Sequence, residues 1–61
     1  MKIVHGITGN KYILGTLREV QDVCFEIGKS EHSVQYFEKY DCYVARVKSK
    51  KHKLRLKQLY E

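Results

Sequence analysis

The chain has 61 residues, 43% of them hydrophobic and 31% charged, with no proline. This composition is that of a globular protein and excludes a disordered chain, and the length allows one domain, residues 1–61, with a thin core. Such a chain has no room for a cofactor-binding domain or a deep substrate cleft, so we expect a non-catalytic protein without a cofactor. No apolar run can cross a bilayer and no signal peptide is recognisable, which predicts a cytoplasmic protein with no membrane partner.

The net charge of +5 is concentrated at the C-terminal end. Residues 1–47 contain six basic and six acidic residues, whereas residues 48–61 contain six basic residues and one acidic residue. A dense run of one charge is typical of a segment that binds a polyanion, most often nucleic acid. The alternatives are a solvated end of the chain that confers solubility, or a surface for an acidic protein.

The cysteines and histidines do not have the spacing of a metal site. Cys24 and Cys42 are 18 residues apart, and His5, His32 and His52 are scattered around them. A structural zinc site needs two closely spaced ligand pairs, so we predict no metal. In a cytoplasmic protein the two thiols are expected to be reduced packing residues rather than a disulfide.

The N-terminal third of the chain has the pattern of a β-hairpin. Residues 2–7 are predicted to form a short strand, residues 8–10 a tight turn that contains Gly9-Asn10, and residues 11–17 the returning strand.

Residues 12–27 fit two patterns. Apolar residues at 13, 17, 20, 24 and 27 have helical spacing, with Asn10 as the cap. Against a helix, Gly15 would lie in its interior, the segment is rich in β-branched and aromatic residues, and residues 28–30 resemble a hairpin turn. We therefore favour strands here, with the helix as the alternative.

The C-terminal half contains the clearest alternation. Residues 33–38 and 42–48 are predicted strands joined by a turn at 39–41, and residues 53–57 alternate so that Leu54 and Leu56 share one face. A basic amphipathic helix over 50–60 is the alternative for this last segment. The sum predicts an all-β fold, a small barrel of five or six strands of the SH3-like or Sm-like type. An α+β fold with a helix at about 11–28 is the alternative.

Part of the chain resembles a known barrel family. Gly15–Ile27 resembles the second and third strands of Sm and Hfq-like barrels, and Gln35–Tyr40 with the strand after it resembles their later strands. Lys39 matches the lysine of the RNA-contacting pair of Hfq, whereas Tyr40 stands where that pattern has histidine. The later strands are equally similar to those of other SH3-like and Tudor-like barrels. The resemblance implies a small barrel that binds RNA.

We therefore expect a non-catalytic domain that binds RNA or DNA with weak sequence specificity. Lysine and arginine would bind phosphates, and exposed tyrosines would stack on bases. The candidate residues are Lys48, Lys50, Lys51, His52, Lys53, Arg55, Lys57, Lys39, Tyr36 and Tyr43.

The alternative function is a protein-interaction module. A chain this short, of a size often encoded by phages or mobile elements, would act as an inhibitor or adaptor bound to a larger protein. The small core also favours a homodimer or larger ring over a monomer, since pairing through an edge strand buries additional apolar surface.

Overall fold

The computed structural model describes residues 1–30 and 33–60 and shows a small α+β protein. Four strands form one antiparallel sheet in the order β1-β2-β4-β3. Two helices and the 3₁₀ turn η2 are the other elements whose bounds are described. In chain order the elements are β1 (Lys2–His5), β2 (Lys11–Gly15), α1 (Leu17–Ile27), β3 (Val34–Phe37), η2 (Glu38–Tyr40), β4 (Cys42–Val47) and α2 (Lys50–Tyr60).

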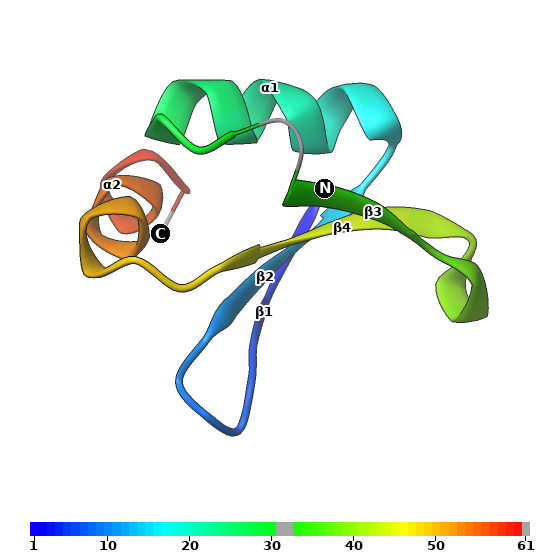
Figure 1. Ribbon diagram of the computed structural model, residues 1–61, viewed down its shortest axis with the longest axis horizontal. Helices are drawn as coiled ribbons and strands as arrows, with labels where there is room; N and C mark the ends of the chain where they lie inside the picture. The colour runs from blue at the N-terminus through cyan, green and yellow to red at the C-terminus, as the bar shows by residue number, and fades with distance from the viewer. Residues whose placement is uncertain (31–32, 61) are drawn as a thin grey trace.

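The hydrophobic core lies between one face of the sheet and the helices. α1 covers this face, α2 lies beside one end of α1, and η2 lies at the far end of the sheet from α2 (Figure 1). Strand alternation turns Ile13, Ala45 and Val47 toward the helices. They form one cluster with buried side chains of the two helices: Val20, Val23, Cys24, Ile27 and Leu56.

The prediction of strands within residues 12–27 is wrong from residue 17 onward, because the ends of α1 are both capped. Thr16 and Glu19 form a capping box: the Glu19 amide donates to Thr16 Oγ1, and the Thr16 amide donates to Glu19 Oε1. At the other end Gly28 adopts the left-handed conformation, and its amide and that of Lys29 donate to the carbonyls of Phe25 and Cys24. Gly15 precedes the helix and therefore does not weaken it.

The strand predicted over 53–57 is also wrong, and the alternative, a basic helix over 50–60, matches α2. The helical period separates the two leucines that an alternating strand would place together: Leu56 is fully buried, whereas Leu54 is 58% exposed. The helix is docked on the rest of the chain, since Lys53 Nζ donates to the Gly9 carbonyl and the Tyr60 hydroxyl donates to Glu26.

The predicted all-β barrel is therefore corrected to an open sheet with helices on one face. Strands do form within the predicted ranges 2–7, 11–17, 33–38 and 42–48, but the two further segments needed to close a barrel are helical. The alternative prediction, an α+β fold with a helix at about 11–28, has the right fold class. However, residues 11–15 of that predicted helix form strand β2 instead. Gly15–Ile27, which carries the resemblance to Sm-like strands, forms mainly α1.

Candidate functional site

The face of the sheet opposite the helices is exposed. Residues paired across antiparallel strands point to the same face. One row on this open face runs from Val4 through Tyr12 to Arg46, and the next runs through Lys2, Leu14, Val44 and Gln35. Unlike the buried residues between them, these side chains are half-buried or exposed.

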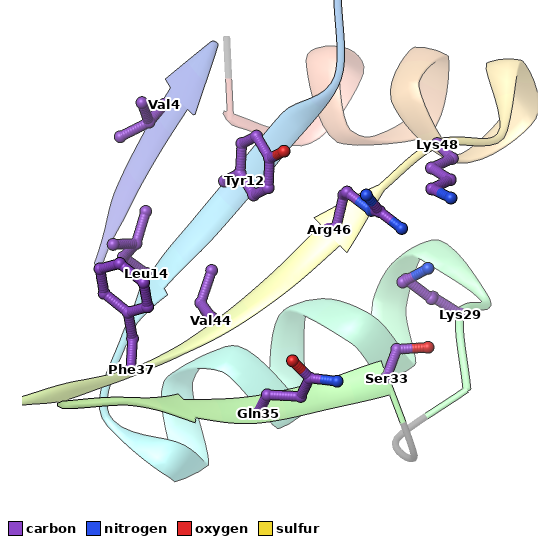
Figure 2. A pocket seen from close by; sticks show the side chains of 10 residues that line it. All are labelled: Val4, Tyr12, Leu14, Lys29, Ser33, Gln35, Phe37, Val44, Arg46 and Lys48. Carbon is purple, nitrogen blue, oxygen red and sulfur yellow. The ribbon is translucent and has the colours of Figure 1, made fainter. Parts of the chain in front are cut away.

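Apart from Lys2, these side chains line a shallow groove with a volume of about 840 Å³, within the range of sites that hold ligands. Figure 2 shows the groove with the helices behind the sheet. Arg46, Lys48 and Lys29 lie toward the end where β4 runs into α2, and Phe37 lies at the opposite end. The middle is apolar, so the groove combines cations with exposed ring and aliphatic surface.

The open face carries positive charge without acidic residues among those described. The acidic side chains Glu19, Asp22 and Glu26 belong to α1, and Glu38 and Asp41 belong to the η2 region. Arg46 and Lys48 form no ion pair with any residue in the ranges 1–30 and 33–60. Their charges are therefore available to an anionic ligand.

The two candidate tyrosines are not part of this face. Tyr36 and Tyr43 pair across β3 and β4 on the helix-facing side, and their rings contact each other edge to face with centroids 5.4 Å apart. The Tyr36 hydroxyl donates to Asp41, and this bond raises the pKa of Tyr36. Tyr43 packs against the core. These contacts give both rings a structural role.

Lys39 is also remote from the other candidate cations. It lies in η2, at the opposite end of the sheet from α2 (Figure 1), with its ammonium 5.5 Å from the centre of the Tyr40 ring. The structure does not bring it together with the basic residues of the C-terminal segment.

The remaining candidates lie in or just before α2 and fall into two groups. His52 and Lys53 are half-buried against the rest of the chain. The others are exposed: Lys48, Lys50, Lys51, Arg55 and Lys57. Among these, Lys48 lines the sheet groove and thus connects the open face with the start of α2.

Tyr12 and Arg46, a ring and a cation that pair across strands on the open face, were not among the residues predicted from the sequence. The signal was present, because β4 was predicted as a strand and its alternation places Val44, Arg46 and Lys48 on one face. Tyr12 and Arg46 are neighbours because β2 pairs with β4. These two strands are separated along the chain by α1 and β3, so local sequence patterns do not show that they pair.

The described residues show no grouping of three or more histidine, cysteine or acidic side chains able to hold a metal ion; His32 lies outside them. Cys24 is buried in the core, where desolvation raises the pKa of its thiol, and Cys42 is half-buried; neither forms a disulfide. Within residues 1–30 and 33–60, no helix has the length and apolar character needed to cross a membrane.

The chain matches no protein-family model, and no curated protein or solved structure is significantly similar to it. The similarity to Sm-like barrels therefore stays a prediction from the residues.

Proposed function

We propose that this protein is a non-catalytic nucleic-acid-binding domain whose ligand lies on the open face of the sheet. The observation that carries the proposal is the groove in which Arg46, Lys48 and Lys29 lie at one end and accessible ring and aliphatic side chains line the rest. Phosphates bind arginine and lysine, and bases bind apolar and aromatic surface. The absence of described acidic residues on this face means that no local carboxylate repels the phosphates.

The exposed cations of α2 extend the same positive surface. Lys50 and Lys51 follow directly after Lys48, and Arg55 and Lys57 are exposed further along the helix. Such residues give long-range attraction and sequence-independent affinity. This assignment keeps the basic C-terminal segment as part of the interface but places the centre of the site on the sheet. A cytoplasmic location is compatible with this role and remains a prediction.

The test compares two variants with the same change of charge. Arg46→Glu places the reversal in the groove, whereas Lys39→Glu places it at the remote η2 turn. Binding is measured by fluorescence anisotropy titrations with labelled nucleic acid. Arg46→Glu should weaken binding by about tenfold or more, because it removes a phosphate contact, whereas Lys39→Glu removes none and should weaken binding by less than about threefold. Equal weakening by both variants would show that net charge alone drives binding.

Salt dependence gives a second measure of the same surface. If Lys2, Lys29, Arg46 and Lys48 each contact a phosphate, affinity for a single strand should fall by about 50-fold between 50 and 200 mM salt. Affinity that does not change with salt contradicts the proposal.

A protein partner is the second candidate, favoured by the apolar middle of the groove, where Val4, Leu14 and Val44 lie. Failure to bind any nucleic acid at 50 mM salt, together with one stoichiometric protein partner that survives nuclease treatment, would establish this alternative. The predicted homodimer rests on edge strands β1 and β3, each of which pairs with a single neighbour in the described sheet. A melting temperature independent of protein concentration would contradict it.

A further inference from the structure

The size of the open face restricts which form of nucleic acid it can bind. Four strands spaced at about 4.8 Å place the outer strand axes about 14 Å apart, before side chains are added. The major groove of B-DNA is about 12 Å wide and admits a helix or a two-stranded ribbon. The sheet as a whole therefore cannot enter the groove of a duplex.

A duplex lying outside on the sheet would also be a poor match. Its outer surface consists of phosphates, and these would meet the apolar side chains Val4, Leu14 and Val44 in the middle of the groove. Phosphates lose hydration there without gaining a hydrogen bond, which is unfavourable. Unpaired bases, in contrast, offer flat apolar surfaces that bind well to such a face.

Tyr12 is the ring in this groove best placed to stack on a base. Phe37 already stacks on Tyr40, with centroids 5.3 Å apart. Tyr12 makes no ring stack and its hydroxyl forms no hydrogen bond with the described residues. Its cross-strand neighbour on β4 is Arg46, so a ring and a cation stand side by side where a base and its phosphate would bind.

The Tyr12 ring lies close to the backbone of Gly6. A Cβ added at Gly6 would lie 2.8 Å from Tyr12 Cε2, which is closer than such atoms approach. The missing side chain of Gly6 thus leaves the space into which the edge of the ring fits. A larger residue at position 6 would have to displace the ring from this place.

We propose that the open face binds single-stranded nucleic acid, with a base stacked on Tyr12 and the adjacent phosphates bound by Arg46 and Lys48. This inference rests on the proposed function and specifies its ligand. Base stacking and phosphate binding are available to single-stranded DNA and single-stranded RNA alike. Titration with each of the two strands shows which one the protein binds more tightly.

The first experiment uses fluorescence, because the chain contains no tryptophan. Tyr12→Trp introduces a single indole in the groove, and Phe25→Trp introduces one on the exposed side of α1, where Phe25 is 79% exposed. Adding an unlabelled 12-nucleotide single strand should quench the first variant and leave the second unchanged. Quenching of neither variant, at strand concentrations that saturate binding, would overturn the assignment of Tyr12.

The second experiment separates stacking from charge. Tyr12→Leu should weaken binding of the single strand by roughly 5- to 150-fold with an unchanged salt slope, whereas Tyr12→Phe should retain most of the affinity. Arg46→Ala should instead lower the salt slope by about 0.7. Thermal melting of each variant confirms that it is folded, and the retained affinity of Tyr12→Phe distinguishes loss of the ring from loss of structure.

The outcomes separate this inference from the proposed function. Binding of a 12-base-pair duplex as tight as that of the single strand, or an affinity unaffected by Tyr12→Leu, would overturn the stacking of a base on Tyr12 while nucleic-acid binding through Arg46 stands. Absence of binding to single strand and duplex alike at 50 mM salt would overturn both. Preference for the single strand together with loss on Tyr12→Leu supports both.

Discussion

The two faces of the sheet are built from neighbouring residues of the same strands, yet they differ in burial and in charge. On the covered face Ile13, Ala45 and Val47 are at most 1% exposed and belong to the core. On the open face, Tyr12 and Arg46 alternate with them and remain accessible. Because side chains alternate along a strand, stability and binding are encoded at interleaved positions, and one can be altered with little effect on the other.

The two helices show the same division. Each has 11 residues, but α1 buries four side chains and has both ends capped, whereas α2 buries Leu56 alone and carries a row of exposed cations. α1 thus closes the core, and α2 contributes charge at the cost of a small apolar contact area. The following predictions test this separation of roles.

The largest expected effect comes from neighbouring residues in β2. Ile13→Ala should reduce the free energy of unfolding by about 3–5 kcal/mol, because it leaves a cavity between the sheet and the helices. Leu14→Ala, on the open face, should cost about 1 kcal/mol or less. Urea denaturation of both variants measures the difference. Similar losses at the two positions would mean that the open face is also part of a packed core, as in a dimer formed face to face.

The leucines of α2 should differ in the same way. Leu56→Ala removes the only fully buried side chain in this helix and should cost about 2–4 kcal/mol. Leu54→Ala should change stability by less than about 0.5 kcal/mol, since its side chain is 58% exposed. Thermal melting is a suitable measurement, because 1 kcal/mol corresponds to about 4–8 °C for a domain of this size. A stable Leu56→Ala variant would show that α2 is not required for the fold.

A smaller effect is expected at the N-terminal cap of α1. Thr16→Ala removes the hydroxyl that accepts the Glu19 amide and should cost about 1 kcal/mol, while Thr16→Ser should retain most of the stability. Nucleic-acid affinity should be unchanged in both variants at temperatures where they are folded, because the cap does not line the groove of the open face. An affinity that falls with Thr16→Ala in the folded protein would contradict the separation of the two faces.

The smallest effect is a dependence on acid pH at the same cap. The Thr16 amide and the N-terminal ammonium of Met1 both donate to the Glu19 carboxylate, and these bonds lower its pKa from 4.5 to about 2. A lowered pKa in the folded protein means that the ionised form stabilises it. This contribution is therefore present above pH 4.5 and lost as the pH falls toward 2. Melting temperatures between pH 7 and pH 2 should decline less in Glu19→Gln than in the wild type; parallel curves would contradict the assignment.

The strands were predictable from local patterns, whereas both helices were predicted only as alternatives, although the sequence signals for the ends of α1 were present. Thr16 followed three residues later by Glu19, with Gly28 after the last apolar residue, marks the ends of α1. Preference for β-branched and aromatic residues outweighed these signals in the sequence analysis. In the structure, burial of Val20, Val23 and Cys24 on one helical face decides in favour of the helix despite their modest helix propensity.

For the candidate site, the sequence predicted the presence of positive charge but not its centre. The exposed cations of the C-terminal segment follow from composition alone. The separation of Tyr36 and Tyr43 from these cations, and the meeting of Tyr12 with Arg46, depend on strand pairing between residues far apart in the chain. No local rule gives that register.

The amino-acid sequence by itself determined the size of the domain, the segments in which the four strands form and the position of the excess charge, because these follow from composition and from alternation within short segments. Only the tertiary structure decided which face of the sheet is covered. Two helices are too few to cover both faces of a four-stranded sheet, so both pack on the side of Ile13 and Ala45. Arg46 is left exposed and Tyr12 half-buried as a consequence, and the binding surface that we propose is the face that the core does not use.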